Sequence, residues 1–188
     1  MNSAYEKLTD CYESVKGELP FKPKVALVLG SGLGDYVKKM KVEKIISYHD
    51  IDGFPVSTVQ GHKSQFVFGY VGNVPIVAMQ GRVHYYEGYS MTGVVLPIRL
   101  MRLMGAEVLF LTNASGGVNY DYEPGDFMLI QDQIASFVPS PLIGTNIDEL
   151  GTRFPDMSEI YDEDLCKLIR YTASDIQLTL RDGHYLQI

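Results

Sequence analysis

The sequence of 188 residues predicts an α/β fold with a mixed central β-sheet flanked by helices. Three observations lead to this prediction. Short aliphatic runs alternate along the chain with segments of helical periodicity, as in sheets whose strands are joined by helices. Two aliphatic runs end in glycine-rich turns, and two further β-rich runs are joined by only two residues, which indicates an antiparallel hairpin. We therefore expect parallel and antiparallel strands in one sheet.

In the first part of the chain we predict helix 4–16, strands 24–29, 65–71 and 74–80, and helix 92–104. The first helix has apolar residues at helical spacing and is ended by Gly17 and Pro20. The strand after it is an unbroken aliphatic run. The next two strands are separated by Gly72-Asn73, a typical hairpin turn. Gly105 follows the second helix as its C-terminal stop.

In the second part we predict strands 107–112 and 126–131, a loop over 132–157, a helix from Asp162 to about Ser174, and a hairpin at the end of the chain. The loop is rich in Pro, Gly and Ser. The acidic start of the helix complements its dipole. The hairpin is expected from two apolar runs, 177–180 and 184–188, on either side of Asp182-Gly183.

Composition excludes several classes of protein. Hydrophobic residues make up 46% of the chain, which excludes disorder, and the length favours a single domain over 1–188. The net charge of -7 argues against nucleic-acid binding, which needs Lys and Arg to neutralise phosphates. We find no signal peptide and no run long enough to cross a bilayer. Cys11 and Cys166 have no metal-type spacing. We expect a soluble, reduced, cytoplasmic protein that does not bind membranes.

Glycine-rich turns follow two of the aliphatic strands: Gly30-Ser31-Gly32-Leu33-Gly34 and Asn113-Ala114-Ser115-Gly116-Gly117. Ligands bind beyond the carboxyl ends of strands in open α/β sheets, and backbone N–H groups in such turns can bind anions. Taken alone, each turn is also compatible with an ordinary strand-to-helix connection. The first is one residue short of the G-x-G-x-x-G fingerprint, so a dinucleotide-cofactor domain is an alternative that the spacing disfavours.

A dense polar cluster, Gln80-Gly81-Arg82-Val83-His84-Tyr85-Tyr86-Glu87-Gly88, follows predicted strand 74–80. On an extended segment Arg82, His84 and Tyr86 would share one face. Arg suits bidentate binding of a phosphate, and His adds a switchable charge or hydrogen bond. Beside two candidate anion-binding turns, the cluster predicts a phosphate site. The alternative is a partly buried cluster held by structural hydrogen bonds.

Together, and in one order, these segments resemble the trimeric purine nucleoside phosphorylases of the inosine/guanosine type. The quoted segments are joined by Gly61-His62, Phe54-Pro55-Val56-Ser57-Thr58-Val59, Gly125-Asp126-Phe127-Met128-Leu129-Ile130 and Arg153-Phe154-Pro155-Asp156-Met157-Ser158. The resemblance covers nearly the whole chain. It implies a phosphorylase/hydrolase-like α/β fold and reversible phosphorolysis of purine ribonucleosides or deoxyribonucleosides to free base and (deoxy)ribose 1-phosphate. It also implies a role in purine salvage, a homotrimer, and no metal or organic cofactor.

The resemblance assigns roles to matching positions. The residues that it places on phosphate are Ser31, His62, Arg82, Val83, His84 and, through its backbone N–H, Ala114. It makes His84 the catalytic residue and places Tyr86 along the ribose. Glu87 would orient His84 from behind, and Asn113 would support the second turn.

The chain departs from the family at its C-terminal end. In the family, the segment resembling 180–187 continues into another large segment. That segment supplies an acid and an amide that read the purine ring, a further phosphate-binding serine, and a histidine near the ribose 5′-hydroxyl. We therefore expect the N-terminal two-thirds of the family domain, incomplete at its C-terminal end. Two hypotheses stay open: a purine nucleoside phosphorylase chain, and an inactive remnant that binds phosphate without the purine-recognition segment.

Overall fold

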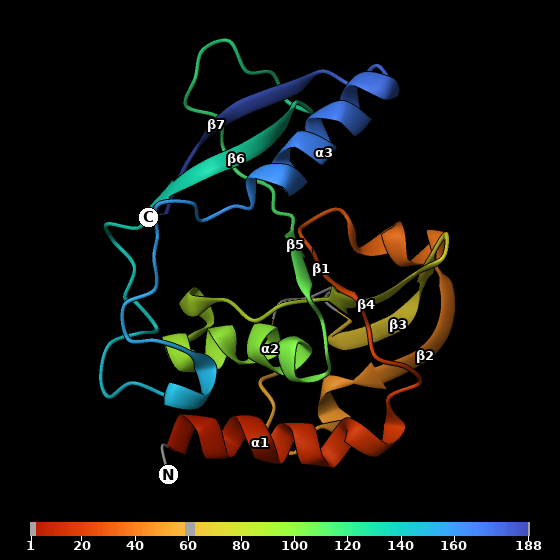
Figure 1. Cartoon of the computed structure of the whole chain (residues 1–188), viewed down its shortest axis with the longest axis vertical. Coiled ribbons are helices and arrows are strands. Elements are labelled where there is room, and N and C mark those ends of the chain that lie inside the picture. The colour runs from red at the N-terminus through yellow and green to blue at the C-terminus, as the bar shows by residue number, and fades with distance from the viewer. Residues whose placement is uncertain (1–2, 59–62, 188) are drawn as a thin grey trace. The chain divides into compact units, whose positions relative to one another are not determined.

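The computed structural model describes residues 3–58 and 63–187, and the chain divides into two compact units between Ser115 and Gly116. The elements of the first unit are α1 (Ser3–Val15), η1 (Lys16–Glu18), β1 (Val25–Leu29), η2 (Gly34–Lys39), β2 (Lys41–Ser47), η3 (Tyr48–Asp50), β3 (Gln65–Val71), β4 (Val74–Gln80), η4 (Tyr85–Glu87), α2 (Met91–Leu103) and β5 (Val108–Leu111), where η marks a 3-10 helix (Figure 1). The helices and strands predicted here are confirmed to within one residue at each end. The prediction of a single domain over 1–188 stays a prediction.

The five strands of the first unit form one mixed sheet in the order β2-β3-β4-β1-β5. β1 lies between β4 and β5 and runs parallel to both, whereas β3 runs antiparallel to β2 and β4. The predicted α/β class with a mixed sheet is confirmed. Because β4, β1 and β5 are parallel neighbours, their carboxyl ends meet at one edge of the sheet, which is where α/β proteins bind ligands.

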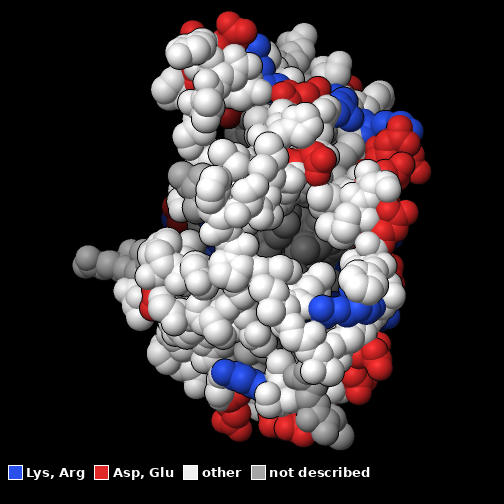
Figure 2. Space-filling view, turned by 90° about the vertical axis from the view of Figure 1, so that its left-hand side faces the viewer, with Lys and Arg blue, Asp and Glu red and all other residues white. Residues whose placement is uncertain are grey.

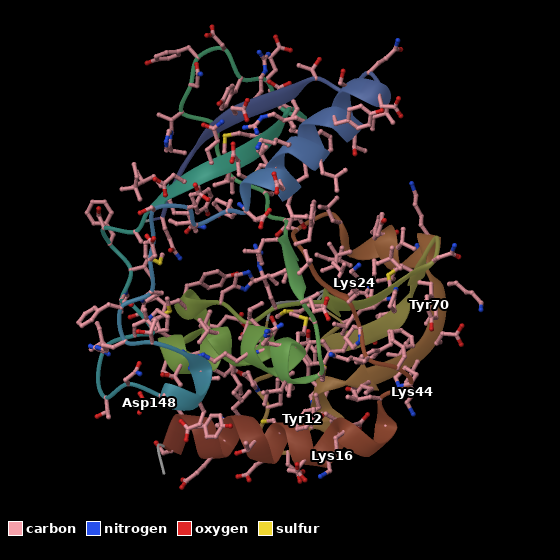
Figure 3. All side chains as sticks on the ribbon, viewed as in Figure 1. Tyr12, Lys16, Lys24, Lys44, Tyr70 and Asp148 are labelled. Atoms are coloured by element: carbon pink, nitrogen blue, oxygen red, sulfur yellow. The ribbon has the colours of Figure 1, made fainter. Side chains whose placement is uncertain are left out.

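The central strands β3, β4 and β1 are covered by apolar side chains on both faces, whereas β2 and β5 are largely exposed. On one face, residues such as Val28, Phe66 and Met79 pack against the apolar stripes of α1 and α2. Tyr12, seen on α1 in Figure 3, packs against the same cluster. On the other face, Leu29, Val67 and Ala78 form a smaller cluster with residues of the η2 segment. Strands β1 and β4, buried on both faces, are a stable support for the turns that follow them.

Strand β2 was not predicted, because its residues do not show the regular alternation that marks a strand. It is one of the two edge strands of the sheet and bears charges, with Lys41 paired to Glu43 and Lys44 to Glu18. A register shift between Val42 and Lys44 interrupts the alternation that marks a strand. Figure 3 shows Lys44 on this outer side of the sheet. Charged side chains on an edge strand discourage pairing with other chains.

The second unit contains β6 (Phe127–Ile134), η5 (Asp148–Leu150), α3 (Glu163–Asp175) and β7 (Leu180–Leu186). β6 extends three residues beyond its predicted end and into the predicted loop. The side chain of Asp162 accepts a hydrogen bond from the Leu165 N–H at 2.9 Å and caps α3, as the acidic start predicted. In the described part of the chain, we find no helix with the length and apolar character needed to cross a membrane.

The predicted C-terminal hairpin is wrong. Asp182-Gly183 does not turn but lies inside β7, which pairs in parallel with β6. Gly183 lies opposite Ile130, and a Cβ added to it would lie 2.6 Å from the Met128 Sδ and 3.0 Å from the Tyr122 hydroxyl. The glycine is explained by this close approach of side chains. Asp-Gly alone does not indicate a turn where a neighbouring strand is available for pairing.

Candidate active site

The first glycine-rich turn lies at the carboxyl end of β1. The Leu33 N–H donates to the Gly30 carbonyl at 3.0 Å, and Gly32 between them has a φ of +83°, which glycine adopts at little cost. Gly30 itself lies against the end of β5. A Cβ at this position would lie 2.6 Å from the Thr112 carbonyl oxygen and 2.6 Å from the Asn113 Cα. The two glycine-rich turns therefore touch through their backbones.

Thr112 joins these two turns. Its hydroxyl donates to the Val28 carbonyl at 2.7 Å and accepts from the Gly30 N–H at 2.9 Å. Its backbone N–H also donates to the Val28 carbonyl, at 3.1 Å. The Thr112 side chain thus accepts from the Gly30 N–H, which would otherwise need another partner. It also fixes the spacing of the two turns.

Arg82 follows β4 and reaches the same place. Its Nη1 donates to the Thr112 carbonyl at 3.2 Å, and its Nε donates to the His84 Nε2 at 3.2 Å. The backbone before it is held by the Tyr48 hydroxyl, which donates to the Gly81 carbonyl at 2.8 Å. Burial raises the pKa of this tyrosine well above its ordinary value, which keeps the hydroxyl a donor. A guanidinium is therefore fixed where the three strand ends meet.

The hydrogen bonds of the His84 ring indicate which of its two nitrogens carries the proton. Because Nε2 accepts from Arg82, we assign the ring proton to Nδ1. Nδ1 lies 3.0 Å from the Glu87 Oε1, an acceptor suited to that proton. The same Glu87 Oε1 also accepts a hydrogen bond from the His84 backbone N–H, at 2.7 Å. Glu87 thus orients the imidazole so that Nε2 faces the guanidinium.

The Glu87 carboxylate is the hub of this arrangement, and only 2% of its side chain is exposed. The Thr58 N–H donates to Oε2 at 2.6 Å, the Thr58 hydroxyl at 2.8 Å and the Ser57 hydroxyl at 3.2 Å. Burial by itself raises the pKa of Glu87, but the bonds from Thr58 and His84 together lower it to about 2. The carboxylate is therefore ionised at neutral pH.

Replacing Glu87 by glutamine is expected to destabilise the fold at neutral pH by about 2 kcal/mol, because an amide cannot accept from all of these donors. The low pKa of about 2 means that the carboxylate stabilises the fold fully above its ordinary pKa of 4.5 and loses this effect as the pH falls toward about 2. The difference in the free energy of unfolding between wild type and Glu87→Gln should therefore become smaller as the pH is lowered. Urea unfolding at about pH 7 and about pH 3 measures it.

The control for this prediction is Glu107→Gln, since Glu107 is exposed at the start of β5. It should change the free energy of unfolding by less than about 0.5 kcal/mol at either pH. If the free energies of unfolding of wild type and Glu87→Gln differ by the same amount at both pH values, the assigned role of the carboxylate is contradicted.

The other predicted site residues are placed as follows. The Tyr86 ring stacks on the His84 ring, with centroids 4.8 Å apart and an interplanar angle of 19°, and its side of the site is open, with 74% of the residue exposed. Ser31 and Ala114 are exposed on the two joined turns. Val83 is 3% exposed, which leaves only its backbone for ligand contact. His62 lies outside the described residues.

One geometric expectation is wrong. Arg82 and His84 come together as the alternation predicts, but the extended backbone ends at His84 and Tyr85–Glu87 form η4. Tyr86 therefore meets His84 by ring stacking and not as the next residue on an extended face. The reason is local: the Glu87 side chain accepts from the His84 N–H, which starts a helical turn at this point.

The prediction from sequence missed several residues that build this site. Thr112 joins the turns, Thr58 and Ser57 hold Glu87, and Tyr48 holds Gly81. The Asn113 backbone lies against Gly30, and the Asn113 side-chain amide donates to the Ala114 carbonyl at 3.4 Å; its supporting role stays a prediction. Hydroxyl residues carry no periodic signal, and their partners lie about 30 or more residues away along the chain.

The arrangement offers a few fixed donors that an anion could bind, with the Arg82 guanidinium beside the two turns. On the face drawn in Figure 2, the described Lys and Arg side chains lie scattered among uncharged and acidic residues. Over residues 3–58 and 63–187, the structure has no group of three or more His, Cys, Asp or Glu residues that could hold a metal ion. The first glycine-rich turn leads into the six-residue η2 and not into a long α-helix, which differs from the dinucleotide-binding arrangement.

Comparison with known proteins places the chain among phosphorylases. Residues 24–188 match the family model described as the phosphorylase superfamily. The chain is 48% identical over 172 residues to purine nucleoside phosphorylase 1 of Geobacillus stearothermophilus, an alignment that covers 92% of this chain and 63% of the relative. The chain thus spans less than two thirds of the length of this curated relative.

Solved structures agree with this comparison. A purine nucleoside phosphorylase in complex with ribose-1-phosphate superposes with a TM-score of 0.90 at 35% identity, covering 96% of this chain and 68% of that one. The Schistosoma mansoni purine nucleoside phosphorylase in complex with adenosine also has a TM-score of 0.90, at 35% identity, covering 97% of this chain and 66% of that one.

Proposed function

Because this chain belongs to the phosphorylase superfamily and, within it, to the purine nucleoside phosphorylase family, we propose that it carries the phosphate site of an enzyme that cleaves purine nucleosides with inorganic phosphate. The products are a free purine base and ribose 1-phosphate or its deoxy form. The observation that carries this proposal is the Arg82–His84–Glu87 cluster at the end of β4, placed beside the two joined glycine-rich turns.

The proposed reaction is a displacement at the anomeric carbon of the sugar. A phosphate oxygen bonds to C1′ while the bond from C1′ to the purine nitrogen breaks, and the purine leaves with that electron pair and then takes up a proton. The transition state resembles an oxocarbenium ion, as in glycoside hydrolysis. The enzyme must hold a multiply charged anion against a neutral sugar carbon, and such positioning can remove roughly 7–11 kcal/mol from the barrier.

Each residue of the cluster suits a part of this task. Arg82 presents parallel N–H donors that match two phosphate oxygens. When phosphate enters, the His84 Nε2 can exchange its bond from Arg82 for a phosphate hydroxyl, while Glu87 keeps the imidazole oriented through Nδ1. Ser31 and the Ala114 N–H would complete the cradle from the two turns. Tyr86, exposed and stacked on His84, would lie along the ribose.

The test is to incubate the chain with inosine and phosphate and to follow hypoxanthine release by chromatography, with a reaction lacking phosphate as the control. We expect hypoxanthine and ribose 1-phosphate in equal amounts, and only where phosphate is present. Release of hypoxanthine without phosphate would indicate hydrolysis and contradict the proposal.

The same experiment separates the second hypothesis, an inactive remnant that binds phosphate. If no base is released but phosphate still raises the midpoint of thermal unfolding, the chain binds the anion without turning over nucleoside. If neither effect is seen, the proposed site is wrong. Binding of NAD(H) in place of phosphate would favour the dinucleotide alternative.

The homotrimer and the cytoplasmic location that the resemblance implies stay predictions. Analytical ultracentrifugation of the chain, with a trimer expected, tests the assembly.

A further inference from the structure

We infer that Gln80 is a positioning residue of the phosphate site and that its side-chain amide holds the first glycine-rich turn in register with Arg82. The inference rests on the proposed function, because it concerns phosphate affinity. Gln80 is the last residue of β4 and is only 4% exposed. In the sheet it lies between Leu29, which directly precedes the turn, and Gln65, the first residue of β3.

Both ends of the Gln80 amide are used. Nε2 donates to the Gly34 carbonyl at 2.6 Å, and Oε1 accepts from the Gln65 Nε2 at 2.7 Å. Because a carbonyl can only accept, the amide must present its nitrogen to Gly34, which leaves its oxygen for Gln65. The position thus requires one group that donates and accepts at once. Glutamate has the same shape but, when ionised, cannot donate to Gly34.

This bond completes a clamp on the turn. At the first end the Gly30 N–H donates to the Thr112 hydroxyl, and at the last end the Gly34 carbonyl accepts from Gln80. Ser31 and Gly32 lie exposed between the two fixed points. A turn held at both ends presents its backbone N–H groups to an anion without having to be ordered when the anion binds.

The same residue is tied to Arg82 through the backbone. Gly81 lies between them with a φ of +96°, and its carbonyl accepts from the buried Tyr48 hydroxyl at 2.8 Å. Gln80 is fixed through its side chain and Gly81 through its carbonyl, so the backbone leading to the guanidinium is held at two consecutive residues. This junction therefore links the turn to the guanidinium through the strand, in addition to the contacts that both make with Thr112. Displacement by about 1 Å can cost up to a hundredfold in a site that depends on positioning.

The test measures phosphate affinity by isothermal titration calorimetry, together with thermal unfolding, for the 188-residue chain. Gln80→Met keeps the size of the side chain but removes both hydrogen bonds, and Gln80→Glu removes the donor and, when ionised, adds a negative charge, so Gln80→Met is the decisive variant. We expect both to raise the dissociation constant for inorganic phosphate by about tenfold, measured well below the unfolding midpoint. Gln131→Met, at an exposed position of β6, is the control and should leave this constant unchanged.

Gln65→Met supplies the second line of evidence, and it also serves if Gln80→Met fails to fold. It removes the bond that holds the Gln80 Oε1, so a rise of about threefold is expected, from partial loss of one hydrogen bond. The double variant Gln65→Met/Gln80→Met should bind phosphate as weakly as Gln80→Met alone, because the two amides act in series.

The outcomes separate this inference from the proposed function. A lower unfolding midpoint with unchanged phosphate affinity in the Gln80 and Gln65 variants would show a purely structural role and overturn the inference, while the phosphate site stands. If the wild-type chain binds no phosphate, the proposed function fails and the inference fails with it. Additive losses of phosphate affinity in the double variant would also overturn the inference that the two amides act in series.

Discussion

Replacing Arg82 by alanine is expected to weaken phosphate binding by about a hundredfold or more. Arg82 is the only arginine that the structure places at the described ends of β4, β1 and β5, and its Nε and Nη1 already point at site atoms. Each hydrogen bond to a charged group contributes about 1.5–3 kcal/mol, and a guanidinium can offer two in parallel. Losing both removes most of the fixed positive charge from the cradle.

Two further variants sharpen this result. Arg82→Lys keeps the charge but loses the planar pair of donors, so it should fall between wild type and Arg82→Ala. Arg170→Ala is the matched control: Arg170 lies on α3 in the second unit, where it forms an ion pair with Asp182 at 2.8 Å. Such exposed pairs contribute less than about 1 kcal/mol, and no effect on phosphate affinity is expected.

Titration calorimetry with inorganic phosphate measures these affinities, and unfolding curves for each variant confirm that the protein is folded. Equal losses of affinity in Arg82→Ala and Arg170→Ala would contradict the assigned site, because only Arg82 is assigned to it.

Replacing Gly30 by alanine is expected to destabilise the protein by about 3 kcal/mol. The added Cβ would lie 2.6 Å from the Thr112 carbonyl oxygen, 2.6 Å from the Asn113 Cα and 2.9 Å from the Asn113 nitrogen. All three are backbone atoms of the neighbouring turn, so no flexible side chain can move aside. The two turns must separate, which would also weaken phosphate binding in the molecules that remain folded.

Gly17→Ala is the control for this substitution, because a Cβ at Gly17 meets nothing within 4 Å. Its effect should be within about 0.5 kcal/mol of wild type. Urea unfolding curves give both values, provided that the slope with denaturant is unchanged. Similar stabilities for the two variants would mean that the turns are not in the close contact described here.

The fold could largely be predicted from local patterns. The aliphatic runs, the Gly72-Asn73 hairpin and the helical periodicities each mark an element by side-chain spacing within a few residues. The errors occur in segments whose structure depends on pairing with a strand that is distant in the sequence. β2 is an edge strand with charges and a bulge, and Asp182-Gly183 lies in a strand because β6 pairs with it. The partner strands were predicted, but a local pattern does not show which strands pair with each other.

The candidate site divides in the same way. Sequence alone identified Arg82, His84 and Glu87 within six positions, since residues so close along the chain must share a neighbourhood. It could not identify Thr58 as the donor that holds Glu87, or Gln65 as the partner of Gln80, because these pairs are separated by 29 and 15 residues. The positions of such partners depend on which strands become neighbours.

By itself, the sequence determined most of the strands and helices, with β2 and the C-terminal strand β7 as the exceptions, and it showed which segment concentrates polar residues. The tertiary structure decided that β4, β1 and β5 lie side by side, so that two glycine-rich turns and an arginine meet at one edge. The physical reason is the range of the interactions. Turn and strand preferences act within a few residues, whereas strand order follows from burying both faces of the sheet at once, which involves the whole unit.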